Sequence, residues 1–113
     1  MNDNKILSSS TYNLKESVNY AEGSIVSKIV RKNAGGNVSL FAFDKGQNLS
    51  EHSAPFDAMI YIIEGEAKVI IDKKPHHMKE GSFIIMPADV PHAVESLSKF
   101  KMLLIMIQNK ALI

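Results

Sequence analysis

Histidine is the residue type in this chain best suited to chemistry near neutral pH, because its imidazole titrates there and its neutral ring can bind a metal ion. The four histidines are His52, His76, His77 and His92. No two of them show a local metal-binding spacing, such as one helical turn. His76 and His77 are adjacent, so on a strand they point to opposite faces and do not share one ion. Considered singly, each histidine is typical of a surface or hydrogen-bonded position.

The composition indicates one small domain with a balanced charge. The chain has 113 residues, of which 45% are hydrophobic, enough for a packed core. Lys plus Arg number 13 and Asp plus Glu number 12, a net charge of +1, which argues against nucleic acid or a membrane surface as a partner. The absence of cysteine excludes disulfides and thiolate metal sites. The start of the chain lacks the basic and apolar regions of a signal peptide, so we predict a cytoplasmic protein.

The elements that must position the histidines are predicted to be short strands. From residue 23 onward, glycine or proline recurs at intervals of roughly ten residues, with runs rich in Ile, Val, Phe and Met between them. The expected strands are 24–30, 37–43, 66–71, 76–79, 82–86, 92–96 and 100–108, with an extended segment 52–64 interrupted near Pro55. The segments 44–48 and 72–75 are predicted to be turns. One short helix, Leu14–Tyr20, is expected after the capping residue Asn13. The chain is therefore predicted to be all-β with a short N-terminal arm.

The segment GQNLSEHSAPFDAMIYIIEG, from Gly46 to Gly65, resembles the first conserved motif of the cupin superfamily. That motif runs Gly, five residues, His-x-His, three residues, Glu, six residues, Gly. In this chain Gly46, His52 and Gly65 stand in register with it. The second histidine position of the motif is Ala54, and the glutamate position is Ala58.

The segment GSFIIMPADVPHAVES, residues 81–96, resembles the second cupin motif, which runs Gly, five residues, Pro-x-Gly, two residues, His, three residues, Asn. Gly81, Pro87 and His92 match it, whereas Asp89 replaces the glycine and Ser96 replaces the asparagine. The resemblance implies a double-stranded β-helix, a jelly-roll-like barrel of two packed antiparallel sheets. We place the N-terminal arm, with its short helix, at residues 1–22 and the cupin barrel at residues 23–110.

The resemblance also implies a metal site that has lost half of its ligands. Cupins that bind a metal usually use two histidines and a glutamate from the first motif and a histidine from the second. Only His52 and His92 remain here, because alanine at positions 54 and 58 offers no lone pair. Two imidazoles can hold one divalent transition metal, such as Fe, Mn, Ni or Zn, but only weakly. The alternative is that the two histidines form a hydrogen-bonded pair that lines a pocket.

Two further residues are candidates for completing a metal site. Asp57 precedes the vacant glutamate position by one residue, so it points to the other face unless a β-bulge turns it inward. His76 could join the site if its strand faces the barrel interior. The residues predicted to line the pocket are Ala54, Ala58, Tyr61, Phe83 and Met86.

Three functions follow from these observations as competing hypotheses. The first is a small cupin-domain protein that binds a small molecule, and a divalent metal as well, through His52 and His92. The second is a metal-dependent enzyme of the oxygenase or isomerase type, or a cofactor-free enzyme in which one histidine acts as general base. The third is a non-catalytic barrel for assembly or regulation. The apolar strand 100–107 is expected to lie in a homodimer interface.

Overall fold

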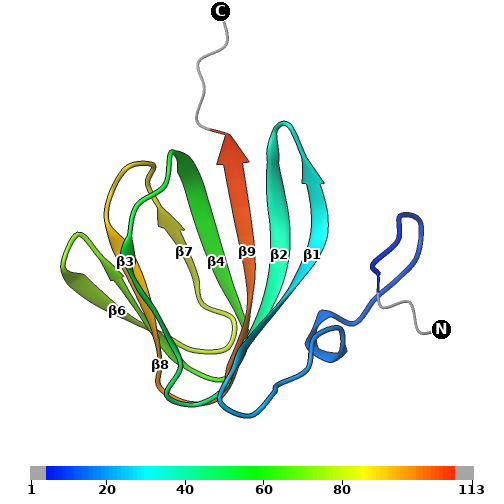
Figure 1. Cartoon of the computed structure of the whole chain (residues 1–113), viewed down its shortest axis with the longest axis horizontal. Helices are drawn as coiled ribbons and strands as arrows, with labels where there is room; N and C mark the ends of the chain where they lie inside the picture. The colour runs from blue at the N-terminus through cyan, green and yellow to red at the C-terminus, as the bar shows by residue number, and fades with distance from the viewer. Residues whose placement is uncertain (1–4, 109–113) are drawn as a thin grey trace, which may run out of the picture.

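The computed structural model describes residues 5–108, which form nine strands and one short 3-10 helix (Figure 1). The elements are η1 (Leu14–Glu16), β1 (Ile25–Asn33), β2 (Gly36–Phe43), β3 (Asn48–His52), β4 (Phe56–Glu64), β5 (Ala67–Ile71), β6 (Lys74–Met78), β7 (Phe83–Met86), β8 (His92–Ser96) and β9 (Phe100–Gln108). They make a five-stranded sheet, β1-β2-β9-β4-β7, and a four-stranded sheet, β3-β8-β5-β6, and every strand pair is antiparallel. The predicted all-β, two-sheet architecture is confirmed. No helix within residues 5–108 has the length and apolarity to cross a membrane.

The main core lies between the inner faces of the two sheets. Along β4 the residues Ala58, Ile60 and Ile62 are buried at every second position, as expected for a strand with one face turned to the core. Phe43 and Phe100, which are partners on β2 and β9, stack with their ring centroids 4.4 Å apart and are fully buried. Each buried side chain of this size contributes roughly 1.5–3 kcal/mol to folding. Val94 of β8 belongs to the same core and Leu49 of β3 packs against it, so the core also holds the two strands that carry His52 and His92.

Two edge strands depart from the sequence-based expectation. Residues 48–52 form β3, and the turn predicted at 44–48 overlaps the start of this strand. The segment is polar, and it becomes a strand at the edge of the sheet because it pairs with β8. The turn before β6 is confined to Asp72 and Lys73, whose φ angles of +50° and +70° suit a tight hairpin. Pro75 lies inside β6, which is tolerated because β6 is an edge strand and needs fewer ladder donors.

The N-terminal arm packs against the outer face of the five-stranded sheet. Val18 is 3% exposed and forms a second buried cluster with Leu40, Ala42 and Ile63. The predicted helix is reduced to the 3-10 turn η1, although Asn13 does cap it by accepting a hydrogen bond from the backbone N–H of Lys15 at 3.0 Å. The helix ends early because docking Val18 into this cluster takes precedence over a marginal helical propensity.

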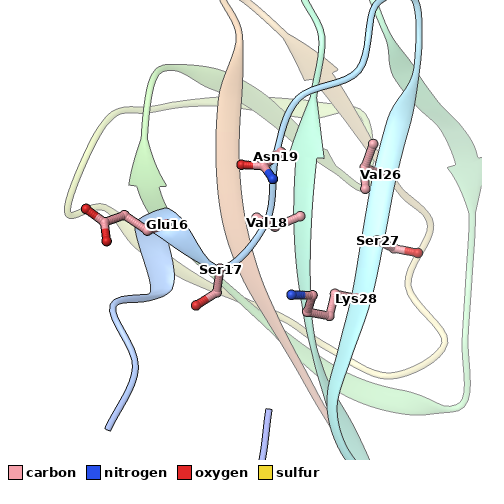
Figure 2. Close-up of a pocket in the computed structure, with 7 residues that line it drawn as sticks. All are labelled: Glu16, Ser17, Val18, Asn19, Val26, Ser27 and Lys28. Carbon is pink, nitrogen blue, oxygen red and sulfur yellow. The ribbon is translucent and has the colours of Figure 1, made fainter. Parts of the chain in front are cut away.

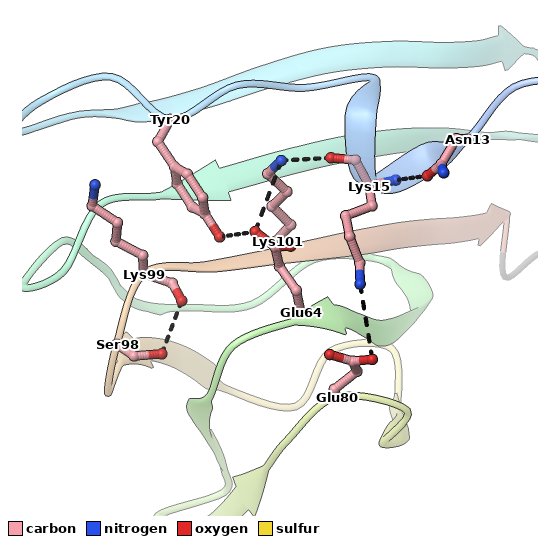
Figure 3. A network of polar contacts seen from close by, with 8 residues as sticks. All are labelled: Asn13, Lys15, Tyr20, Glu64, Glu80, Ser98, Lys99 and Lys101. Carbon is pink, nitrogen blue, oxygen red and sulfur yellow. Dashed lines mark hydrogen bonds and ion pairs between the residues drawn. The ribbon is translucent and has the colours of Figure 1, made fainter.

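A polar cluster fastens the arm to the sheet (Figure 3). The Tyr20 hydroxyl donates to Glu64 Oε2 at 2.6 Å, and the ammonium of Lys101 lies 3.8 Å from the same oxygen. Lys101 also donates to the carbonyl oxygen of Lys15 in the arm. Burial, and then the neighbouring Glu64 carboxylate, raise the pKa of Tyr20 far above its ordinary value, so the hydroxyl keeps its proton. The arm is thus part of the folded domain.

Candidate functional site

His52 and His92 lie side by side at one end of the four-stranded sheet. His52 is the last residue of β3 and His92 the first of β8; they are cross-strand partners with ring centroids 4.5 Å apart. Leu49 on β3 pairs with Val94 on β8, and both face the core. His52 is three positions from Leu49, so regular alternation would turn it outward. The register shift between Leu49 and His52 acts as a bulge that returns it to the face of His92.

Backbone carbonyl groups orient both imidazole rings in the same way. His52 Nδ1 lies 2.8 Å from the carbonyl oxygen of Ser50, and His92 Nδ1 lies 3.1 Å from that of Val90. A carbonyl oxygen only accepts, so in each ring Nδ1 carries the hydrogen and donates it. In the neutral rings Nε2 is therefore left with a free lone pair. This orientation serves a metal ligand and a hydrogen-bond acceptor equally well.

The two histidines differ in their exposure to solvent. His92 is 6% exposed, whereas His52 is exposed. Burial lowers the pKa of His92 below its ordinary value, the hydrogen bond to the Val90 carbonyl opposes that change, and the neighbouring His52 lowers the pKa further. The ring of His92 is consequently neutral at pH 7, with Nε2 available as an acceptor.

Folding stability is expected to fall with acidification because of His92. Its pKa in the folded chain is lower than in the unfolded chain. Below about pH 6.5 the unfolded state therefore takes up a proton that the folded ring resists, and stability present above that pH is progressively lost. Melting temperatures measured from about pH 8 to about pH 5 should decline more steeply for the wild type than for His92→Leu. Equal slopes would show that His92 does not contribute to the pH dependence.

Asp57 is tied to the loop that precedes His92 and is not grouped with the imidazoles. Its Oδ1 accepts a hydrogen bond from the backbone N–H of Ala88 at 3.0 Å, and the carbonyl of Ala54 accepts from the N–H of Asp89 at 2.8 Å. These two contacts fix the loop 87–91 against the start of β4. Asp57 therefore helps to place His92 through the backbone, a role that the sequence did not reveal.

Asp89 replaces the glycine of the family motif and adopts the conformation that a glycine would favour. Its φ is +66°, in the left-handed region. Aspartate tolerates this region better than most residues because its short side chain bonds locally. The substitution therefore preserves the loop that leads to His92.

The residues predicted to line the pocket divide between the two faces of the five-stranded sheet. Ala58 and Met86 are cross-strand partners on the inner face and are 3% and 2% exposed. Ala54 is half-buried in the connection between β3 and β4. Tyr61 and Phe83 are also partners, but they lie on the outer face and are 40% and 53% exposed. Tyr61 is three positions from Ala58, and Phe83 is three positions from Met86. An odd separation places two side chains on opposite faces of a strand, so Tyr61 and Phe83 point away from the interior.

The remaining histidines lie on β6, away from the pair. His76 Nδ1 is 3.2 Å from the carbonyl oxygen of Val69, and His77 Nε2 is 2.9 Å from Glu66 Oε1. Within residues 5–108 no group of three or more His, Cys, Asp or Glu side chains is arranged to hold a metal ion. The described residues thus supply two imidazole donors at the candidate site.

A separate cavity of about 290 Å³ lies between the N-terminal arm and β1 (Figure 2). It is lined by Glu16, Ser17, Val18, Asn19, Val26, Ser27 and Lys28. Val26 packs against the second buried cluster, which the arm covers on the outer face of the sheet, so this cavity lies on the opposite side of the sheet from the barrel interior. The sequence carried no signal for it, because it exists only where the arm docks.

Comparison with known proteins relates both the sequence and the fold to one family. The family model described as Cupin domain matches residues 39–108. A conserved protein of unknown function from Streptococcus pyogenes is 32% identical, with a TM-score of 0.89 over 95% of this chain and 94% of that one. A cupin 2 conserved barrel domain protein from Leptotrichia buccalis is 42% identical, with a TM-score of 0.82 over 85% of this chain and 47% of that one.

A cupin superfamily protein from Desulfitobacterium hafniense is similar in fold, with a TM-score of 0.87 at 24% identity over 93% of this chain and 96% of that one. No curated protein matches the chain. The comparisons therefore define a fold and a family, and the chemistry of the site has to be argued from its own residues.

Proposed function

This chain belongs to the cupin family, and from that premise we propose that its barrel binds a small organic molecule beside His52 and His92. The observation that supports this proposal is the placement of two imidazoles as cross-strand partners, with ring centroids 4.5 Å apart and both Nδ1 atoms engaged by backbone. The two Nε2 atoms are then left to accept hydrogen bonds from a ligand. Small-molecule sites are mostly apolar and carry a few precisely placed polar groups, and two acceptors beside apolar core residues fit that description.

The surroundings of the histidines favour a ligand with a hydroxyl or N–H group on an apolar body. Ile71 pairs with His92 across the sheet, and Leu49 lies on the strand of His52; both pack against the core. On the facing sheet, Ala58 and Met86 present small and flexible apolar side chains. A neutral imidazole accepts from a donor group, whereas it offers no charge to an anion.

The donors at this site do not fit a firmly held metal ion. Catalytic zinc sites use three protein ligands and structural sites use four. His52 and His92 supply two, Ala54 and Ala58 supply none, and Asp57 Oδ1 already accepts from Ala88. An ion held by the imidazole pair would therefore be weakly bound. On this donor set we do not propose an oxygenase or isomerase reaction.

Ligand-observed NMR with a library of small alcohols, phenols and amides tests the proposed function. We expect hits whose affinity falls at least ~10-fold in His52→Ala and in His92→Ala, since each variant removes one acceptor. His76→Ala and His77→Ala are matched controls that remove an imidazole from β6 and should leave the affinity unchanged. Circular dichroism establishes that each variant is folded. Because His52 is exposed, its replacement by alanine should disturb folding less than the replacement of His92.

The opposite results would separate the competing functions. Hits that bind equally well to both histidine variants, or a library without hits, would contradict the proposal and favour an assembly or regulatory barrel. A stoichiometric metal ion in the purified protein, lost on treatment with a chelator, would favour a metal-dependent enzyme instead.

A further inference from the structure

One row of cross-strand partners runs across the inner face of the four-stranded sheet, at the end that holds the two imidazoles. His52 on β3 pairs with His92 on β8, and His92 pairs in turn with Ile71 on β5. Ile71 pairs with Lys74, the first residue of the edge strand β6. Cross-strand partners point to the same face of a sheet, so these four side chains lie at one level of the barrel. The row thus carries two imidazoles at one end, an ammonium group at the other and an apolar side chain between them.

The side chain of Lys74 starts on the inner face of this sheet. Met78 lies four positions further along β6 and is 3% exposed in the main core. An even separation on a strand places both side chains on one face, so Lys74 begins on the face that Met78 turns to the core. Its cross-strand partner Ile71 also packs against that core. Lys74 itself is exposed, so its ammonium group stays in contact with solvent at the end of the barrel.

The hairpin that precedes Lys74 is joined to both segments that carry the imidazoles. The backbone N–H of Asp72 donates to the carbonyl oxygen of Pro91, the residue before β8, at 2.9 Å. The ammonium group of Lys73 lies 3.0 Å from Oε1 of Glu51 on β3. Lys73 is therefore paired with a carboxylate, whereas within residues 5–108 no carboxylate forms an ion pair with Lys74. Contacts to both segments hold Lys74 in place beside the imidazoles, and its charge is left for a ligand.

We propose that Lys74 binds the carboxylate of a ligand whose hydroxyl group donates to the imidazole pair, so that the barrel takes a small hydroxy acid. This inference rests on the proposed function and adds a positive charge at the far end of the row. Neighbouring strands are about 4.8 Å apart, so the backbone of Lys74 lies roughly 10 Å from that of His92. The lysine side chain spans part of that distance, and a short aliphatic chain or a single ring over Ile71 spans the rest. An ammonium group forms a stronger hydrogen bond to a carboxylate than to a neutral amide.

Isothermal titration with matched pairs of probes tests the proposal. The probes are ω-hydroxyalkanoates of graded chain length and para-hydroxyphenylacetate, each compared with its primary amide, which keeps the hydroxyl group and removes the charge. At least one acid should bind the wild type ~10-fold or more tightly than its amide does. Lys74→Met keeps the length of the side chain without the ammonium group, so it should abolish this preference and leave the affinity for the amides unchanged. Lys74→Arg keeps a positive charge and should retain the preference.

Lys79→Met is the matched control, because it removes an exposed lysine just beyond the other end of β6 and should leave the preference for acids intact. Acids and amides that bind the wild type equally, or a preference that survives in Lys74→Met, would overturn this inference. Loss of binding in His52→Ala would show in that case that the proposed function still holds. If no probe binds, or if His52→Ala and His92→Ala bind the probes as the wild type does, the proposed function is wrong and this inference falls with it.

Discussion

Ala54→His combined with Ala58→Glu is expected to raise the affinity of the barrel for Ni²⁺ or Zn²⁺ at least about 100-fold, equivalent to about 2.8 kcal/mol. The wild type offers two imidazole donors, His52 and His92, whose Nε2 lone pairs are free. The two substitutions add an imidazole and a carboxylate at the positions where the family motif has them. Four protein donors complete the coordination that two leave open. Isothermal titration with each ion measures the gain.

The same variant is expected to be less stable without metal than with it. Ala58 is 3% exposed and pairs with Met86 and Met106 on the inner face, so a glutamate there buries a carboxylate among apolar side chains. That burial costs about 1–3 kcal/mol unless a partner compensates it. A bound divalent ion supplies the partner, and the melting temperature should rise on addition of Ni²⁺ by mass action.

Ala54→His combined with Ala58→Gln is the matched control, because it keeps the size of the side chain at position 58 and removes the carboxylate. It should gain less affinity than the glutamate variant. A folded Ala54→His, Ala58→Glu protein that binds either ion no better than the wild type would show that the four positions do not converge. The interpretation of His52 and His92 as the remainder of a metal site would then be wrong.

Most of the fold was predictable because glycine and proline residues separate its strands in the sequence. The elements that were missed depend on tertiary contacts. Glycine and proline mark the ends of most strands, and alternating apolar residues mark the strands themselves. The predicted strands 92–96 and 100–108, for example, match β8 and β9. The polar segment Asn48–His52 lacks such alternation and becomes β3 only by pairing with β8. The predicted helix shortens because Val18 is drawn into a cluster on the sheet.

The pairing of His52 and His92 was predictable only from the alignment of the sequence with the two family motifs. The juxtaposition of His52 and His92 requires a bulge after Leu49, and no glycine or proline in that strand marks it. Tyr61 and Phe83 could have been assigned to the outer face from strand alternation alone, since the inward residues Ala58 and Met86 are three positions away from them. The bond from Ala88 to Asp57 depends on the return path of the loop, which residue types do not specify.

Gly65→Ala is expected to destabilise the protein by about 2–5 kcal/mol, the largest effect that we predict for a single substitution. Gly65 has a φ of +81°, and a Cβ there would overlap the carbonyl oxygen of Lys99 and the backbone of Phe100. Phe100 is fully buried and stacks on Phe43, so it cannot move aside without disturbing the core. The left-handed conformation costs ~1–2 kcal/mol, and the overlap adds a further ~1–3 kcal/mol.

Gly81→Ala is a matched control for this substitution because it isolates the conformational part of the cost. Gly81 has a similar φ of +89°, but nothing lies within 4 Å of the position that a Cβ would occupy there. Urea denaturation should therefore show a loss of only ~1–2 kcal/mol for Gly81→Ala. If both variants lose the same free energy of unfolding, the close approach of the backbone to Gly65 does not add to the cost of a side chain there. A larger loss at Gly65 would show that the turn at 64–66 packs so closely against the chain entering β9 that it leaves no room for a side chain at position 65.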